Sequence, residues 1–294
     1  MDRRIFINGL MGAAAMTALP MSALAAGTGR LKQGVAKSLF GRMPFEDGCK
    51  MAASLGAQGI DFADKPEEWA AVKRHGMIVS MLRADYHNDD DYRHPGPLGW
   101  HAIGLKQAQG EYLEAVHGVI DTAAAHGFPN VIVQAGDRKQ VSYDEGADNS
   151  VEFLNKVKAH AEAKNVTVCM EILNSIGFQA PKMSLFDHMA WGVKVMQRVN
   201  SPRVKILYDV FHAQLMEGNI VQTIRDDFQY IGHVHTGAVP GRHELWRADE
   251  LDYRFIAQAL VDLNYGGFVT HEWSPSPGSD PTEDLRRSIE LMTV

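Results

Sequence analysis

A short apolar run followed by a segment of helical periodicity recurs eight times along this chain of 294 residues. Strands that are joined through helices lie parallel in one sheet, so the repeat predicts a parallel sheet covered by helices. We expect strands near residues 34–40, 59–62, 77–82, 130–134, 166–171, 204–209, 230–235 and 267–272. We expect helices after residue 44 and near 66–75, 107–126, 146–164, 185–199, 220–228, 251–263 and 282–291. Eight such units without a second apolar core predict a single (β/α)8 TIM barrel of the α/β class, which typically takes about 250 residues.

The first 25 residues have the features of an export signal. Arg3 and Arg4, followed by Phe6, resemble a twin-arginine signal, and an uncharged stretch runs from residue 10 to about 26. Residues 23–25, Ala-Leu-Ala, offer a cleavage site. We predict an export signal at 1–25, a catalytic barrel at 26–294 and a periplasmic or exported location. An ordinary secretion signal, or a membrane anchor that is not cleaved, are the alternatives. The stretch is short, rich in Ala and interrupted by Pro20, so no stable membrane span is expected after processing.

The charge and the cysteines limit the partners of the chain. The net charge is −7, and nucleic-acid binding needs a basic surface, so no nucleic-acid partner is expected. Cys49 and Cys169 fall in a predicted helix and a predicted strand, which is not the pattern of a disulfide framework. A small-molecule partner is expected instead. Assembly into a homo-oligomer is compatible with the sequence.

Four of the predicted strands end in a side chain that suits metal binding, namely Glu171, Asp209, His235 and Glu272. The carboxyl ends of parallel strands meet at one face of the sheet, so these groups should converge. Clustered carboxylates are costly to keep ionised without a cation, and together with an imidazole they suit Mg²⁺, Mn²⁺ or Zn²⁺. A single strand-end carboxylate caps a helix about as readily as it binds a metal, so the prediction rests on all four residues.

Other polar residues near the strands receive weaker or structural interpretations. Asp61 and Gln134 are further polar candidates at strand ends. His233 shares the inward face with His235 but lies one layer deeper, which favours a hydrogen-bonded core histidine. His271 should face the helices and be structural.

The segment from about residue 84 to 105 fits neither a strand nor a helix. Its His87, His94 and His101 could bind a second metal, but a charged, solvated loop is the expected state. Trp100 is a candidate for a lid over a sugar ring.

Four motifs resemble a known family. They are Tyr208-Asp-Val-Phe-His212, Ile231-Gly-His-Val-His235, Pro240-Gly-Arg-His-Glu244 and His271-Glu-Trp273. In this order they are similar to the hydroxypyruvate isomerase branch of the xylose isomerase-like TIM barrels, which also includes ketose 3-epimerases. His235 matches the epimerases, since hydroxypyruvate isomerases tend to have an amide side chain there.

The resemblance implies a Mg²⁺- or Mn²⁺-dependent aldose–ketose isomerase or epimerase, whose expected partner is a small-molecule hydroxy-carbonyl compound or sugar. It places the metal ligands on Glu171, Asp209, His235 and Glu272. It implies that His212 and Arg242 orient the oxygens of the substrate and that Glu244 is a partner for either of them. His212 also lies three residues past Asp209, from where it can donate to a substrate oxygen.

The residues suit proton transfer next to a carbonyl group. Such a reaction needs an acid, a base and a group that stabilises the charge on the enediolate oxygen, and a metal ion supplies the last as a Lewis acid. We expect Glu171 and Glu272, from opposite sides of the substrate, to be the catalytic acid–base pair. A metal-dependent keto-sugar lyase or hydratase is one alternative, and a non-catalytic periplasmic sugar-binding barrel is another.

Overall fold

The computed structural model describes residues 30–83, 102–139, 141–176, 183–247 and 249–294. The predicted export signal and the segment with His87, His94, Trp100 and His101 lie outside the described residues. No helix in the described ranges is long and apolar enough to cross a membrane.

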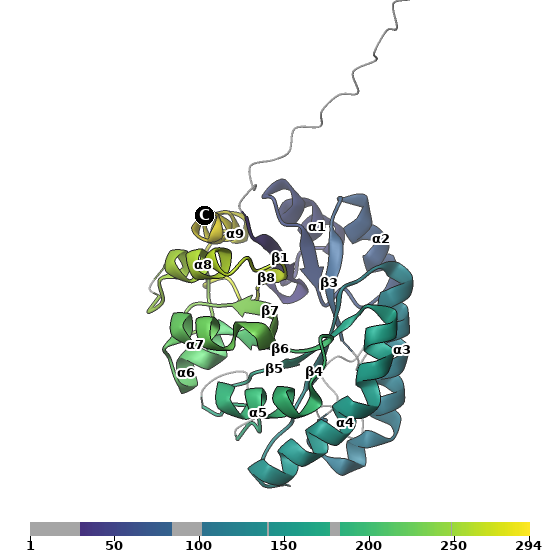
Figure 1. The fold of residues 1–294 in the computed structure, drawn as a ribbon. Helices are drawn as coiled ribbons and strands as arrows, with labels where there is room; N and C mark the ends of the chain where they lie inside the picture. Colours follow the sequence, from purple (N-terminus) through teal and green to yellow (C-terminus); the bar gives the residue numbers. More distant parts are fainter. Residues whose placement is uncertain (1–29, 84–101, 140, 177–182, 248) are drawn as a thin grey trace, which may run out of the picture.

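Eight parallel strands form a closed barrel inside a ring of helices (Figure 1). The strands are β1 Lys32–Ala36, β2 Gly59–Asp61, β3 Ile78–Arg83, β4 Asn130–Gln134, β5 Thr167–Glu171, β6 Val204–Asp209, β7 Ile231–Thr236 and β8 Phe268–His271. They follow one another around the barrel in chain order, and β1 pairs with β8 to close it. The predicted (β/α)8 architecture is confirmed.

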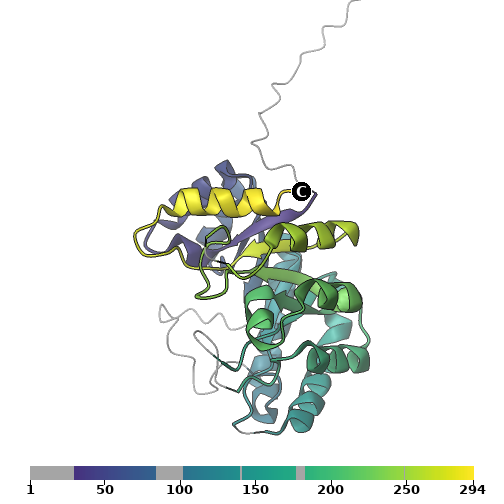
Figure 2. The same ribbon diagram turned by 90° about the vertical axis from the view of Figure 1, so that its left-hand side faces the viewer.

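At least one helix follows each strand from β1 to β8 along the chain, and two of them lie between β6 and β7. They are α1 Phe45–Ser54, α2 Pro66–Arg74, α3 Glu111–His126, α4 Tyr143–Lys164, α5 Met189–Val199, α6 Val210–Met216, α7 Ile220–Asp227, α8 Tyr253–Asp262 and α9 Pro281–Met292. The last helix, α9, lies beside β1 in both views (Figures 1 and 2). Gln33 of β1 ties the two together, because its amide donates to the carbonyl oxygen of Ile289 in α9 at 3.2 Å.

Two apolar clusters of different size determine where the polar site can form. The large cluster fills the space between strands and helices and includes Val35, Val168 and Leu260. A small cluster inside the barrel includes Met81, Cys169 and Leu207. Polar side chains, among them those of Asp61 and His233, share the barrel interior with this small cluster, and the packed strands form the wall around them.

Most predicted elements are present with boundaries shifted by a few residues, and two larger differences lie near the site. The run expected as a strand over residues 34–40 leaves the sheet after Ala36 and continues as a 3-10 helix, Lys37–Phe40. An additional helix, α6, begins directly after Asp209, where no helix was predicted before residue 220. This helix places His212 on its first turn, next to the end of β6.

Candidate active site

The four predicted metal ligands converge at the carboxyl ends of neighbouring strands. Glu171 is the last residue of β5, and Asp209 is the last residue of β6. His235 is the second-last residue of β7, and Glu272 directly follows β8. One nitrogen or oxygen atom from each lies within 4.8 Å of the corresponding atoms of the other three. The parallel register accounts for this, since Asp209 is the direct neighbour of His235 across β6 and β7.

The imidazole of His235 has one nitrogen without a hydrogen bond, and this nitrogen faces the carboxylates. Its Nδ1 is buried and forms no hydrogen bond, but it lies at ion-pair distance from three carboxylates: 2.8 Å from Oε2 of Glu272, 3.6 Å from Oε1 of Glu171 and 3.9 Å from Oδ2 of Asp209. Ligands about 2.1 Å from an octahedral ion lie about 3 Å apart when adjacent and about 4 Å apart when opposite. The donor atoms therefore have the spacing that a small divalent ion needs.

The charges of the site also suit a divalent cation. Glu171, Asp209 and Glu272 contribute three carboxylates, and Arg242 contributes one buried positive charge. The Nη2 atom of Arg242 donates to Oδ2 of Asp209 at 2.6 Å and also to Glu272. The remaining charge of these groups is −2, which a Mg²⁺ or Mn²⁺ ion would neutralise.

A proton on His235 is the alternative to a cation. Burial alone would lower the pKa of this imidazole, but the charge of Glu272 and the hydrogen bond to Asp61 raise it well above its usual value. The protonated ring and a metal ion thus neutralise the same carboxylates, and metal binding would release this proton.

Asp209 caps a helix and also faces the cluster. Its Oδ1 accepts a hydrogen bond from the backbone N–H of His212 at 3.2 Å, which caps α6. Its Oδ2 is the oxygen that contacts Arg242 and belongs to the four-residue cluster. One oxygen therefore caps the helix, and the other is free of the cap and faces the cluster.

The two candidate catalytic glutamates differ in their surroundings. Burial raises the pKa of Glu171, and the nearby carboxylates of Glu272 and Asp209 raise it further against the opposing effect of His235. Burial would also raise the pKa of Glu272, but Arg242 and His235 hold it at about 2. Carboxyl groups whose pKa values are pushed apart can take different roles in proton transfer.

His212 lies between Arg242 and Asn174. Arg242 Nη1 is 2.8 Å from His212 Nε2, and the Asn174 amide is 2.6 Å from His212 Nδ1. Burial lowers the pKa of His212 to about 4, so the ring is neutral and can accept only one hydrogen bond. It accepts from Arg242, so its Nδ1 carries the proton, whereas the atom of Asn174 placed next to Nδ1 is the amide nitrogen, also a donor. Exchanging the amide oxygen and nitrogen of Asn174 lets Nδ1–H donate to the oxygen, which has no other partner.

Two further predicted residues, Glu244 and Gln134, differ in whether they contact the site. Glu244 is buried, but its hydrogen bonds and ion pairs are not with His212 or Arg242. Its Oε2 accepts a hydrogen bond from the backbone N–H of Ser276 at 3.0 Å, and its Oε1 lies 2.8 Å from Nε of Arg247. Gln134 donates to Oε2 of Glu171 at 3.2 Å and thus supports a site residue.

The histidine predictions agree with the observed contacts. His233 is a fully buried core residue with hydrogen bonds inside the barrel. His271 lies 3.0 Å from Oε1 of Gln33, which itself contacts α9, so it faces the helices as expected.

Asn174 was not predicted from the sequence. It follows β5 in a loop, and its partner His212 comes 38 residues later. No spacing within either segment indicates that these two side chains meet.

Comparison with known proteins identifies the family. The family model "Xylose isomerase-like TIM barrel" matches residues 49–293. A Mus musculus protein named "Putative hydroxypyruvate isomerase" is 30% identical over 209 residues, which cover 68% of this chain and 70% of that protein. A 2-oxo-tetronate isomerase of Pectobacterium atrosepticum is 25% identical over 245 residues, 81% of this chain and 89% of that protein. The crystal structure of a 3-keto-D-glucoside 4-epimerase from E. coli superposes with a TM-score of 0.72 at 20% identity, covering 89% of this chain and 98% of that one.

The chain belongs to the xylose isomerase-like TIM barrel family. This confirms the resemblance predicted from the four motifs, and the names of the relatives agree with the predicted enzyme class, an isomerase. The likeness to the solved epimerase concerns the fold.

Proposed function

We propose that the protein is a divalent-metal-dependent isomerase or epimerase that acts on a small hydroxy-ketone, keto-acid or sugar. The observation that carries the proposal is the convergence of three carboxylates on Nδ1 of His235, a buried nitrogen without a hydrogen bond, at the carboxyl face of the barrel. Active sites of this barrel lie on that face. Mg²⁺ and Mn²⁺ are the ions that we expect, because three of the four ligands are carboxylates.

Four residues would hold the ion, namely Glu171, Asp209, His235 and Glu272. When bound, it would act as a Lewis acid that stabilises negative charge on the carbonyl oxygen of the substrate. Glu171 and Glu272 come from β5 and from the end of β8, on different sides of the cluster. We assign them to removing and returning the proton on the carbon next to the carbonyl.

Arg242 would orient the substrate, and His212, whose two ring nitrogens are engaged by Arg242 and Asn174, would hold the guanidinium in place. The Nε atom of Arg242 donates to the backbone oxygen of Glu272 at 2.9 Å, and its guanidinium lies over the ring of Phe211 at 4.9 Å. These contacts fix the guanidinium beside the cluster, where its remaining donor capacity suits a hydroxyl or carboxylate oxygen of the substrate. The names of the relatives, hydroxypyruvate isomerase and 2-oxo-tetronate isomerase, support a small keto-acid or sugar acid as the substrate.

Chelation in deuterated water tests the proposal. The purified protein is screened against small keto-acids and ketoses, and incorporation of deuterium at carbon is followed by NMR. We expect exchange that stops when the metal is removed and resumes when Mg²⁺ or Mn²⁺ is added, together with a lower thermal midpoint for the metal-free protein. Full exchange in a sample without measurable metal would contradict the proposal. Loss of water from the substrate would instead identify a lyase or hydratase.

We also propose that residues 1–25 direct the protein out of the cytoplasm. The paired Arg3 and Arg4, the uncharged stretch and the small residues at 23–25 support this.

A further inference from the structure

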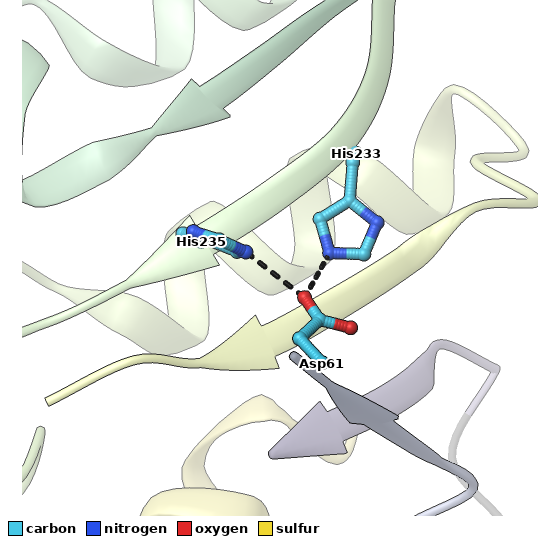
Figure 3. A group of neighbouring side chains, drawn as sticks. All are labelled: Asp61, His233 and His235. Atoms are coloured by element: carbon cyan, nitrogen blue, oxygen red, sulfur yellow. Dashed lines mark hydrogen bonds and ion pairs between the residues drawn. The ribbon is translucent and has the colours of Figure 1, made fainter. Parts of the chain in front are cut away.

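Below the four-residue cluster lies a second polar group that the proposed chemistry does not use. Asp61 of β2 reaches across the barrel to two histidines of β7 (Figure 3). One of its oxygens, Oδ2, is 2.8 Å from His233 Nε2 and 3.0 Å from His235 Nε2. All three side chains are fully buried. The group shares His235 with the cluster above it, so one imidazole links the two.

The partners of His233 determine which of its nitrogens carries the proton. The amide nitrogen of Asn130 donates to the backbone oxygen of Ser80 at 2.9 Å and lies 3.4 Å from His233 Nδ1. An amide NH₂ group only donates, so His233 Nδ1 accepts and its Nε2 is protonated. The Nε2–H group of His233 therefore donates to Asp61.

The carboxylate of Asp61 accepts hydrogen bonds at both oxygens. Ser80 Oγ donates to Oδ1, while the two histidines share Oδ2. A carboxylate with donors on both oxygens has no proton to give, so the Nε2 atom of His235 must also be the protonated nitrogen. The lone pair of His235 is then on Nδ1, the atom that faces Glu171, Asp209 and Glu272.

Ring packing holds the imidazole of His235 in this orientation. Phe62 meets it edge to face at 5.8 Å between centroids, and His233 meets it at 5.1 Å with an interplanar angle of 85°. Rotation of the ring by half a turn would remove its hydrogen bond to Asp61. Both the packing and the hydrogen bond therefore direct Nδ1 to the cluster.

The second group has the geometry of hydrogen bonds rather than of a second metal site. Separations of 2.8 and 3.0 Å from Asp61 Oδ2 are those of N–H···O bonds. Both Nε2 atoms carry protons by the argument above, and a metal ligand needs a free lone pair. His233 Nδ1 is engaged by Asn130.

We propose that Asp61 is a positioning residue that sets the tautomer and the orientation of His235, so that Nδ1 is free to bind the metal ion. Asn130 and His233 in turn hold Asp61 in place through the chain of hydrogen bonds described above. A carboxylate that holds a metal-binding histidine typically changes metal affinity by about 10–100-fold when it is removed. The inference rests on the proposed function, since it concerns the ion which that function requires.

Asp61→Asn tests the inference, with metal affinity as the measure. The amide keeps the size of the side chain but has one acceptor instead of two, so the Nε2 atoms of His233 and His235 lose their shared acceptor or compete with an NH₂ group. We expect Mn²⁺ to bind the metal-free variant about 10–100-fold more weakly by calorimetry. Asp284→Asn on α9 is the matched control, because it makes the same change at another buried carboxylate, which contacts Trp246 and Arg247 and none of the four ligands, and its affinity should stay within about threefold of the wild type. Unchanged Mn²⁺ affinity in Asp61→Asn would overturn the inference.

Histidine nitrogen NMR of the Mg²⁺-loaded wild-type protein gives an independent test that does not depend on the folding of a variant. We expect His235 to be a neutral ring protonated at Nε2, and a ring protonated at Nδ1 would overturn the inference. One bound ion per chain is expected, and a second ion lost on His233→Gln would also overturn it. The proposed function is tested separately by His235→Ala. If that variant binds Mn²⁺ as tightly as the wild type, the proposed metal site is wrong. If His235→Ala loses Mn²⁺ binding while Asp61→Asn keeps the wild-type affinity, only the positioning role of Asp61 is rejected.

Discussion

At the scale of single residues, Asp209 combines two roles that a substitution pair can separate. Both Asp209→Asn and Asp209→Ala remove the negative charge of Oδ2 that faces the cluster, so both should weaken Mn²⁺ binding by at least about 100-fold in calorimetry, more than the loss of a supporting residue. Only the alanine variant also loses the acceptor for His212 N. It should therefore be less stable than the asparagine variant by about 1 kcal/mol in urea unfolding of the metal-free proteins. Equal stabilities would show that the cap contributes nothing.

Glu171 and Glu272 can be tested for proton transfer by amide substitution. Glu→Gln at either position keeps the size and one oxygen but removes the proton carrier, so the rate of carbon-bound proton exchange should fall by about 10²–10⁴-fold. Metal content must be measured alongside the rate, because both residues are also proposed ligands. Glu152→Gln, the same change on the exposed face of α4, serves as the control. If metal-loaded Glu272→Gln exchanges the proton at the wild-type rate, Glu272 is a ligand only.

The predictability of the site also differs from residue to residue. Glu171, Asp209 and Glu272 could be located because each closes a buried apolar run, a position that one segment of sequence displays. The role of Asn174 depends on a neutral histidine 38 residues away and on the burial that keeps it neutral. Such a contact has no local signature.

At the scale of elements, the positions of the parallel strands could be predicted from the sequence because both faces of each strand are buried, which produces continuous apolar runs. The same property explains the error after Ala36. Leu39 and Phe40 are buried in the main core like strand residues, so composition does not distinguish the 3-10 helix from a longer strand. Helix α6 was not predicted for another reason. It has seven residues, which are too few to display a helical period.

The segment between β7 and α8 carries a pH-dependent contribution to stability. Burial raises the pKa of Asp249 to about 6, although backbone N–H groups, among them those of Leu251 and Val239, oppose this. The folded state thus binds a proton more tightly than the unfolded chain, so stability is lost as pH rises from about 4 through 6. Asp249 is partly exposed, and solvent screening reduces the expected loss to about 1 kcal/mol.

Asp249→Asn should remove this pH dependence. The amide stays neutral and can still accept from Val239 and Leu251, so the stability of the variant relative to the wild type should increase between pH 4 and pH 7. Urea unfolding of both proteins at several pH values measures the difference. Parallel stability profiles would contradict the raised pKa.

At the scale of the whole molecule, closure of the barrel creates contacts that no single repeat contains. Asp61 and His235 are 174 positions apart and meet only because β2 and β7 face each other across the interior. Strand counting predicts that strand-end groups gather at one face, but it does not say which side chains meet below that face. This is why Asp61 could be noted as a strand-end carboxylate while its partner could not be predicted.

The proposed export signal concerns the whole molecule as well, because the twin-arginine route carries proteins that have already folded. A buried cluster of three carboxylates would then acquire its ion before export, during folding in the cytoplasm. Replacing Arg3 and Arg4 with lysine should leave the full-length protein in the cytoplasmic fraction of a bacterial host, with residues 1–25 still attached.

The same two changes at Arg286 and Arg287 on α9 are the control, since lysine can keep their contacts with Glu283 and the protein should still be exported. Cell fractionation and mass spectrometry of the N-terminus measure both results. Unchanged export of the Arg3 and Arg4 variant would exclude the twin-arginine route, whereas cytoplasmic retention of the unaltered protein would show that residues 1–25 are not an export signal.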